Sequence, residues 1–377
     1  MTQDKTNKVS NVPPLRFPEF TEEWEKCTLG ETCTFFSGGT PTSSNKDYYD
    51  GGISFIRSGE INADCTELFL TREGFENSSA KMVEKGDLLL ALYGATSGEI
   101  AISKINGAIN QAILCIRSSN NNIFVKSVWE KHVQHILQVY LQGGQGNLSA
   151  DIVKKLSFYF PLIEEQNKIA AFISLLDKRI ATQIRVIEDL QTLKKAIRKQ
   201  IFSELLLDKE PNLQIKDVLE YEQPTKYLVT NTEYSDDVTL IPVLTANKAF
   251  ILGYTDEING IYSKGKCIIL DDFTLDCKLV DFPFKVKSSA IKILTAKRGA
   301  NIRYLYEYLR FLDLDTSEHK RHYIAEIEPL EIVVPDINMA NDIANTLEFM
   351  DKRIDLAENM LSLYKQQKQF LLQQMFI

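Results

Sequence analysis

The run Asp177-Lys178-Arg179-Ile180 recurs unchanged at Asp351-Lys352-Arg353-Ile354, 174 residues further along the chain. Around these runs, the windows 161–202 and 335–376 carry the same residue at twelve of 42 positions without a gap. The identical pairs are Pro161/Pro335, Ile163/Ile337, Asn167/Asn341, Ile169/Ile343, Ala170/Ala344, Asp177/Asp351, Lys178/Lys352, Arg179/Arg353, Ile180/Ile354, Lys194/Lys368, Gln200/Gln374 and Phe202/Phe376. Chance resemblance between two amphipathic helices rarely includes both a shared proline and a four-residue identity, so we interpret the windows as an internal repeat.

Both windows are predicted to be long helices. Each follows a strand-like run that ends in proline, and no glycine or proline occurs in 162–210 or from 336 to the last residue. Apolar residues are spaced alternately three and four apart, the heptad pattern of a left-handed coiled coil. The seam positions are Ile173, Leu176, Ile180, Gln183, Ile187, Leu190, Lys194, Ile197 and Ile201 in the first copy, and Leu347, Met350, Ile354, Ala357, Leu361, Tyr364, Lys368, Leu371 and Met375 in the second.

The seam contains one lysine at the same position in each copy, Lys194 and Lys368. A polar seam residue lowers stability but can fix register or orientation. The alternative is that both lysines extend their charged ends into solvent. Each helix would otherwise expose an apolar stripe, so we expect the stretches around Ile180 and Ile354 to pack against each other. A heptad stretch of roughly 30 residues would be about 45 Å long, a little over one turn of B-DNA, ~34 Å.

Two regions, residues 19–160 and 211–334, are rich in short strand-like runs, turn residues and aromatic residues; we call them the first and the second module. Each is predicted to end in a helix, Val125–Gln142 and Asn301–Leu312. The sequence therefore predicts an α+β protein with mostly antiparallel sheets, in which two globular modules are separated by two long antiparallel coiled-coil helices with an internal pseudo-two-fold repeat. The expected segments are 1–18 at the N-terminus, 19–160, 161–210 as the central helical region, 211–334, and 335–377 as the C-terminal helical region.

The modules also match weakly in the order of their features. Lys85-Gly86 and Lys264-Gly265 each precede a strand-like run, and Ala112 and Ala290 each begin another. The two helices are similar to each other, whereas the two modules have diverged. This is the arrangement expected of one scaffold that carries two different recognition modules.

Composition limits the class of protein. The formal net charge is −8 and the pI about 5.3, so the chain is not coated in basic charge, and a partner is expected to supply much of any positive surface. Six cysteines show no C-x-x-C spacing, and no signal peptide is evident at residues 1–10, which favours reduced thiols in the cytoplasm. No apolar run approaches the ~20 residues that span a bilayer.

Catalytic motifs are not evident in the sequence. Gly265-Lys266-Cys267 lacks the frame of a phosphate-binding loop, and Asn11-Val12-Pro13-Pro14-Leu15 is not the motif of an amino-methyltransferase. The histidine pairs His132/His135 and His319/His322 have a spacing that could ligate a metal on a helix, but no third ligand is obvious. We therefore expect no metal site, and surface or phosphate-contacting histidines instead.

Loops with small, hydroxyl and basic residues are the candidates for contacts with nucleic acid. Glycines allow close backbone approach, hydroxyls suit phosphate oxygens, and Arg or Lys pairs with guanine. The candidates in the first module are Gly38, Gly39, Thr40, Thr42, Ser43, Lys46, Arg57, Ser58, Arg72, Tyr93, Ala95 and Thr96. The candidates in the second module are Asn247, Lys248, Lys264, Lys266, Lys285, Lys287, His319, Lys320 and Arg321. For any single residue, a solvated surface role is the competing interpretation.

At this point the chain resembles the specificity subunits of type I restriction-modification systems. The opening 14–20 (PLRFPEF) with Trp24, the run Gly38-Gly39-Thr40-Pro41 and the Gly-Ala-Thr of 94–96 resemble the start of the family and its target-recognition domain. The pattern Pro161…Gln166…Ile169-Ala170 resembles its helical region. The second half departs from the family, because it lacks these two loop motifs and has Ala340 where glutamine is expected.

The resemblance implies a DNA-recognition subunit that is not itself catalytic. Each target-recognition domain would read one half of a split, asymmetric site in double-stranded DNA, and the helices would set the spacing and dock two modification (methyltransferase) subunits. S-adenosylmethionine, ATP and magnesium would belong to these and to the restriction (motor-nuclease) subunits.

Two alternatives remain at this stage. A coiled-coil scaffold without nucleic acid would show no salt-dependent DNA binding even with its partners. A self-contained nuclease or methyltransferase would show activity as the purified chain with magnesium or S-adenosylmethionine.

Overall fold

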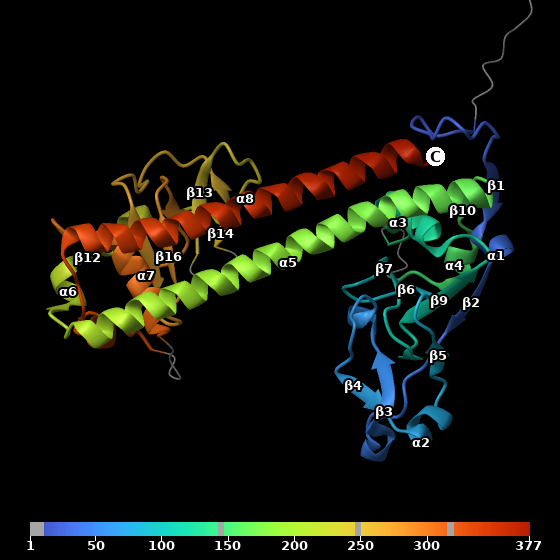
Figure 1. Ribbon diagram of the computed structural model, residues 1–377, viewed down its shortest axis with the longest axis horizontal. Helices are drawn as coiled ribbons and strands as arrows, with labels where there is room; N and C mark the ends of the chain where they lie inside the picture. Colours follow the sequence, from blue (N-terminus) through green and yellow to red (C-terminus); the bar gives the residue numbers. More distant parts are fainter. Residues whose placement is uncertain (1–10, 142–146, 246–249, 315–319) are drawn as a thin grey trace, which may run out of the picture. The chain divides into compact units, whose positions relative to one another are not determined.

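The computed structural model describes residues 11–141, 147–245, 250–314 and 320–377 (Figure 1). Contacts group the chain into two compact units. The first unit joins Met1–Ile184 to Met360–Ile377, and the second is Arg185–Asn359. Each unit therefore contains one module and a part of each long helix. Asn247, Lys248 and His319, which were candidates for DNA contacts, lie outside the described residues.

The two predicted long helices are present. They are α5 (Ile163–Asp208), with 46 residues, and α8 (Ile337–Met375), with 39 residues (Figure 1). In the first unit, Asp177 near the start of α5 lies 2.7 Å from Lys368 near the end of α8. In the second unit, Lys194 toward the end of α5 lies 2.6 Å from Asp351 near the start of α8. Because the early part of one helix meets the late part of the other in both units, the pair is antiparallel, as predicted.

The heptad seam follows the burial of both helices. Every seam position from Ile173 to Ile201 and from Leu347 to Met375 is buried or half-buried. The intervening outward positions are mostly exposed, for example Leu175 and Leu363. The period of 3.5 therefore faces the interior of each unit.

The module of the first unit has two four-stranded sheets. The first sheet has the order β2 (Cys33–Ser37), β9 (Ile113–Ser118), β6 (Leu88–Ala91) and β7 (Ile100–Ile102), and the second has β4 (Leu68–Leu70), β3 (Tyr49–Ile56), β8 (Gly107–Ile109) and β5 (Lys81–Val83). All neighbouring strands are antiparallel except β3 and β8. The strands β1 (Glu25–Thr28) and β10 (Ser157–Phe160) pair where the chain enters and leaves the module.

The module of the second unit repeats this topology. Its larger sheet has the order β12 (Leu219–Glu222), β18 (Ile291–Ala296), β15 (Cys267–Asp271) and β16 (Cys277–Val280), and its smaller sheet has β14 (Ile251–Thr255), β13 (Ile241–Leu244) and β17 (Lys285–Val286). The pair β13 and β17 is parallel, like β3 and β8. An isolated bridge between Tyr262 and Phe284 takes the place of the β5 pairing. The entry pair is β11 (Leu213–Gln214) with β19 (Glu331–Ile332).

The helix that closes each module begins at an asparagine. In the first module, α3 (Asn122–Leu141) contains the predicted helix up to residue 141, and residue 142 lies outside the described residues. The Asn121 side chain accepts hydrogen bonds from the N–H groups of Ile123 and Phe124. In the second, α7 (Ile302–Leu312) is the predicted helix without its first residue, Asn301, which is the cap and accepts from two N–H groups in the same way. Such side-chain caps satisfy N–H groups that the first helical turn leaves free.

The repeated asparagines of the long helices have a structural role. The Asn121 amide donates to Asn167 on α5 at 2.8 Å, and the Asn301 amide donates to Asn341 on α8 at 2.6 Å. The identity of Asn167 and Asn341 is therefore explained by a contact that fastens each long helix to the module before it.

The repeated phenylalanines fill the core of each unit. Phe376, just after α8, packs against Phe124 and Trp24 with ring centroids 5.1 and 6.3 Å apart. Phe202, near the end of α5, packs against Tyr304 and Tyr308 at 5.5 and 5.1 Å. Both phenylalanines are almost fully buried. Each core thus receives the beginning of one long helix and the end of the other.

Several features were not predicted. The parallel pair within each module and the short helices α1 (Leu29–Thr32), α4 (Ala150–Lys155) and α6 (Ile215–Val218) have no clear sequence signal beyond their caps. Ser149, for instance, caps α4 by accepting from the Ile152 N–H.

Across the residues that the structure describes, no helix is both long and apolar enough to cross a membrane. All six cysteines are free.

Candidate nucleic-acid interface

Eight of the twelve candidate residues of the first module gather where the parallel strands β3 and β8 end. The Asn110 N–H, just after β8, donates to Ile56 at the end of β3, and the Gly39 N–H donates to the Ile109 carbonyl. The Thr40 hydroxyl donates to Gln111 at 2.5 Å. We call this the first-module edge: residues 38–40, 57–58, 92–96 and 110–112. It includes 92–96 because the Leu92 N–H donates to the Ala112 carbonyl.

The glycines of this edge are required by packing. A Cβ atom on Gly38 would lie 1.7 Å from the Ile109 carbonyl oxygen, and one on Gly39 would lie 1.8 Å from the Ser79 hydroxyl. These glycines let the loop pass close to β8, and their sequence signal does not require a phosphate. Thr40, Thr42, Ser43 and Lys46 follow in the same loop and are exposed.

Arg57 lies at the edge but already has acidic partners. Its guanidinium is 3.0 Å from Glu60 and 2.5 Å from Glu67, and its side chain is about two-fifths exposed. Hydrogen bonds to Glu60 and Glu67 raise the pKa of Arg57 above its ordinary value, so it stays charged. A phosphate or base would share this arginine with carboxylates, which restrict its direction. The neighbouring Ser58 begins the turn η2 (Ser58–Glu60) and is half-buried.

Arg72 lies outside this edge. It begins α2 (Arg72–Glu76), pairs with Glu76 at 2.8 Å, and its side chain is almost wholly exposed. An exposed pair of this kind contributes little to stability. Its role in DNA binding stays a prediction.

The loop Tyr93–Gly98 is held in place by α3. The Trp129 indole donates to the Gly98 carbonyl at 2.8 Å, and the Ser97 hydroxyl donates to the Leu92 carbonyl at 2.9 Å. Gly94 and Gly98 both have positive φ, which explains the glycines of this loop. Ala95 is exposed and Thr96 half-buried, while partial burial raises the pKa of Tyr93.

The sequence interpretation missed the amides at this edge. Gln111 is exposed and bonded to Thr40, and Asn110 is half-buried beside Ile56. Asn and Gln side chains are the ones that pair with adenine in a groove. Their position at the end of a strand was readable from the sequence, but their closeness to Thr40 and Arg57 depends on the parallel strand pair.

The second module has a corresponding edge with different chemistry. The Lys287 N–H donates to the Leu244 carbonyl, so Lys287 and Thr245 follow neighbouring parallel strands as Asn110 and Arg57 do. Asp272 follows β15, and its N–H donates to the Ala290 carbonyl. We call residues 245, 272, 287–290 and 320–322 the second-module edge. Lys287, Lys320 and Arg321 are its exposed basic residues.

Three candidate lysines of the second module lie elsewhere or are buried. Lys264 and Lys266 precede β15 and so lie at the end opposite to Asp272; Lys264 also bonds both oxygens of Glu222 at 2.8 Å. Lys285 is 4% exposed, pairs with Glu257 at 2.8 Å and donates to the Asn259 carbonyl. Because a buried, paired lysine cannot reach DNA without moving, we leave Lys285 out of the proposed surface.

The histidines are not a metal site within the described residues. No three His, Cys, Asp or Glu side chains there are grouped so that they could hold a metal ion. The expectation of surface histidines is wrong for His322, which is 2% exposed and bonded to Glu326 at 2.8 Å. His132 is half-buried and bonded to the Val128 carbonyl, and burial lowers its pKa.

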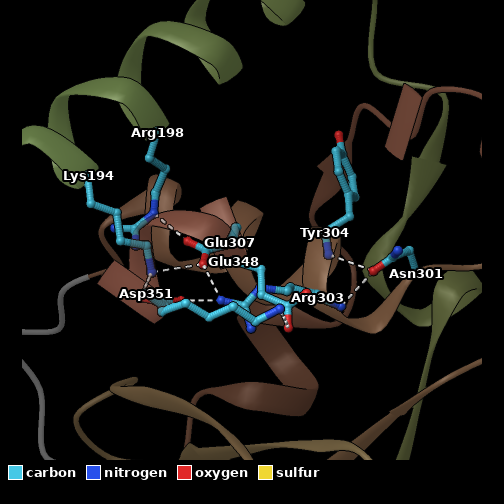
Figure 2. A network of polar contacts seen from close by, with 9 residues as sticks. Lys194, Arg198, Asn301, Arg303, Tyr304, Glu307, Glu348 and Asp351 are labelled. Carbon is cyan, nitrogen blue, oxygen red and sulfur yellow. Dashed lines mark hydrogen bonds and ion pairs between the residues drawn. The ribbon is translucent and has the colours of Figure 1, made fainter. Parts of the chain in front are cut away.

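Each seam lysine forms ion pairs with the other long helix and with the helix of the module. In the second unit, Lys194 lies 2.6 Å from Asp351 on α8 and 3.0 Å from Glu307 on α7, as Figure 2 shows. Arg198 also reaches Glu307, at 2.7 Å, and Arg303 pairs with Asp351. These five residues, which we call the Lys194 cluster, tie the two long helices to the module helix.

The first unit contains an equivalent set. Lys368 lies 2.7 Å from Asp177 on α5 and 2.9 Å from Glu130 on α3, and Lys126 pairs with Glu130 at 2.5 Å. We call these four residues the Lys368 cluster. Neither seam lysine extends freely into solvent, since the side chains are only 10% and 15% exposed.

Taken together, the geometry defines a class of protein: two modules of one topology, each with a polar edge and each fastened to a shared helix pair. Residues 21–191 match the family model of the "Type I restriction modification DNA specificity domain". This match and the relatives below confirm the resemblance drawn from the sequence: the chain is similar to the specificity subunits of type I restriction-modification systems.

Two curated relatives show how far the similarity extends. The specificity subunit of the Escherichia coli type I restriction enzyme EcoR124I/EcoR124II is 47% identical over 129 residues, 33% of this chain and 32% of that protein. The specificity subunit of the type I restriction enzyme MjaIX of Methanocaldococcus jannaschii is 22% identical over 318 residues, 80% of this chain and 70% of that protein. The chain thus spans about a third of the first relative and more than two thirds of the second.

A solved structure has the same fold. The S subunit of the type I restriction-modification system from M. genitalium aligns with a TM-score of 0.60 and 14% identity, covering 97% of this chain and 99% of that chain. This likeness extends through both modules and both long helices.

Proposed function

We propose that this chain is the DNA sequence-specificity subunit of a type I restriction-modification complex. The observation that carries the proposal is the duplication of one topology with two different edges. The first-module edge presents Thr40, Arg57 and Gln111, and the second-module edge presents Lys287, Lys320 and Arg321. Because the two modules present different side chains at their edges, they suit a bipartite, asymmetric site in double-stranded DNA, of which each module reads one half.

In this proposal the chain supplies recognition and its partners supply chemistry. The long helices set the spacer between the half-sites and dock two modification (methyltransferase) subunits; restriction (motor-nuclease) subunits complete the complex in the cytoplasm. S-adenosylmethionine, ATP and magnesium bind to those partners. The acidic net charge of −8 supports a shared electrostatic surface, since DNA binding needs basic residues at phosphates.

Footprinting of the reconstituted complex tests the proposal. The full chain is combined with its modification subunit, and hydroxyl-radical protection is mapped on DNA whose methylated sites have been identified by sequencing the host methylome. Two protected blocks separated by a less protected spacer are expected. A single contiguous block would contradict two recognition modules, and the absence of any salt-dependent DNA binding by the reconstituted complex would favour a scaffold without nucleic acid.

Helix length provides a second test. Adding whole heptads to both long helices keeps the seam in register, so both half-site sequences should stay the same while the tolerated spacer changes. An unchanged spacer would contradict the proposed role of the helices. Insertion of three or four residues, which breaks the register, is the matched control.

A further inference from the structure

A buried ion pair lies beneath the second-module edge. The Asp272 carboxylate, just after β15, is 3.1 Å from the ammonium of Lys292 on β18, and the two side chains are each 2% exposed. The Lys292 ammonium is also 3.0 Å from the Tyr221 hydroxyl and 4.6 Å from the centre of its ring. Taking two charges out of water is costly, so a fully buried pair calls for a reason.

The first module has two leucines at the same positions. Leu92 and Asp272 correspond, because each donates its N–H to the carbonyl of the equivalent alanine, Ala112 or Ala290. Two residues beyond these alanines stand Leu114 and Lys292. Leu92 and Leu114 are 5% and 1% exposed. The same fold therefore closes this position with an apolar pair in one module and with an ion pair in the other.

The Asp272 carboxylate holds the loop at residues 321–323 by polar contacts that a leucine side chain cannot make. One Asp272 oxygen accepts hydrogen bonds from the N–H groups of His322 and Tyr323, at 3.2 and 2.8 Å. The other oxygen, which binds Lys292, lies 4.0 Å from the Arg321 guanidinium. In the first module, the equivalent link is a single backbone bond from Leu148 to the Leu92 carbonyl.

The loop so held carries basic side chains on the surface. Lys320 and Arg321 have side chains that are 53% and 54% exposed. Glu326 adds a second anchor, since it lies 3.1 Å from Lys320 and accepts a hydrogen bond from the buried His322 ring at 2.8 Å. Two acidic groups thus hold the base of the loop, while the side chains of Lys320 and Arg321 are exposed to solvent.

Stability alone does not account for the pair. Replacing a buried ion pair by apolar residues of similar volume is often neutral or stabilising, and the first module already uses that solution. Asp272 also orients the loop. Its carboxylate accepts hydrogen bonds from the backbone of 322–323 and lies close to the side chain of Arg321. A positioned guanidinium loses less conformational freedom when it binds a phosphate.

We propose that Asp272 and Lys292 are positioning residues that hold Lys320 and Arg321 ready for the phosphate backbone of the second half-site. The proposal rests on the proposed function for its ligand, DNA, but its structural part concerns the loop alone. It also predicts a difference between the readers: the second depends on a buried charge pair for its phosphate contacts, and the first does not.

The chain itself suggests the variant. Asp272→Leu with Lys292→Leu copies the first module and leaves the net charge unchanged, so a change in salt dependence cannot come from the overall charge. We expect the reconstituted complex to fold and to bind a full DNA site about tenfold more weakly, with the salt slope reduced by up to ~1.8 for two lost phosphate contacts. Protection should weaken in the second block only, and the amides of His322 and Tyr323 should exchange faster without DNA.

Two further variants complete the test. Lys320→Ala with Arg321→Ala removes the cations directly and should give the same change in slope with normal exchange at 322–323. Asp272→Asn with Lys292→Met keeps the shape more closely, and it replaces the double leucine variant if that one does not fold.

The possible outcomes separate the two proposals. Unchanged affinity and slope in the Asp272/Lys292 variants, beside a loss in the Lys320/Arg321 variant, would overturn the positioning role; so would unchanged exchange at 322–323. No change in the Lys320/Arg321 variant would overturn the phosphate contact. If the unaltered complex binds no DNA, the proposed function fails, while the exchange measurement still tests the loop.

Discussion

The Lys194 and Lys368 clusters are built to one plan but differ in depth. In each, a seam lysine binds an aspartate of the repeated four-residue run and a glutamate of the module helix. Glu307 is 0% exposed and bound by Lys194 and Arg198, whereas Glu130 is 25% exposed. Where the Lys194 cluster has Arg198, the other unit has Leu372, which is part of its apolar core. The comparison shows that the repeat preserves the ion pairs between the long helices and the module helix. The residues around these ion pairs differ: the second unit has an additional arginine, and the first unit has an apolar side chain.

The seam lysine keeps its charge in the more open cluster. Burial disfavours the charged form of Lys368, but Glu130 and Asp177 outweigh it and raise the pKa above the ordinary value. A charged lysine bound by two carboxylates gives a defined pairing of α5 with α8. This geometry supports the hypothesis that the seam lysines fix register and argues against snorkelling.

The largest expected effect is on the repeated phenylalanines. Phe202→Ala and Phe376→Ala should each lower the free energy of unfolding by about 3–5 kcal/mol, because each removes a buried ring from a core. Both tryptophans lie in the first unit, where Trp24 contacts Phe376. Tryptophan fluorescence in urea should therefore shift for Phe376→Ala, and tyrosine circular dichroism should report Phe202→Ala. Equal shifts of both probes in both variants would mean that the units do not unfold separately.

The next effect distinguishes the two charge clusters. Glu307→Ala leaves three cations with Asp351 alone in a buried place and should destabilise the second unit by about 3 kcal/mol. Glu130→Ala removes a partly exposed partner and should cost about 1 kcal/mol. Urea unfolding measures both, with exposed Glu358→Ala as control. A larger loss of unfolding free energy for Glu130→Ala than for Glu307→Ala would contradict the proposed difference in depth between the two clusters.

A functional effect should be confined to one module. Arg57→Ala is expected to weaken DNA binding by about 1–2 kcal/mol through the first half-site only, because Arg57 lies at the first-module edge. Affinities for DNAs altered in either half measure this, and Arg117→Ala is the matched control, because Arg117 pairs with Asp87 at the other end of β9 and is not a candidate for DNA contact. Equal loss for both halves would refute the assignment of one half to each module.

The smallest effect concerns the buried Lys285 of the second module. Hydrogen bonds from Lys285 and from the N–H groups of Asn231 and Thr230 lower the pKa of Glu257 from 4.5 to about 2. A lowered pKa in the folded state means stability that is present above about pH 4.5 and is lost as the pH falls toward 2. The difference in unfolding free energy between the unaltered chain and Glu257→Gln should shrink over that window. A constant difference would contradict the shift.

Sequence reasoning was strongest along the helices. The shared Asp-Lys-Arg-Ile run and the heptad spacing predicted both helices, because a helical pattern is local and repeats every few residues. Reasoning was weaker in the modules: the strand-like runs were found, but the parallel pair β3–β8 was not, since pairing between distant strands leaves no local pattern. The loops of the first-module edge were named individually, and Gln111 was missed for the same reason.

The sequence by itself determined the duplication, the two heptad rods and the two α+β modules, because these depend on composition and spacing within short windows. Only the tertiary structure decided which charges are buried. Lys285, Lys292 and His322 look like surface residues in the sequence, yet each is enclosed and bound to an acidic partner. Burial depends on strands that meet from far apart in the chain, and a charge is enclosed only where the fold also brings its counter-charge.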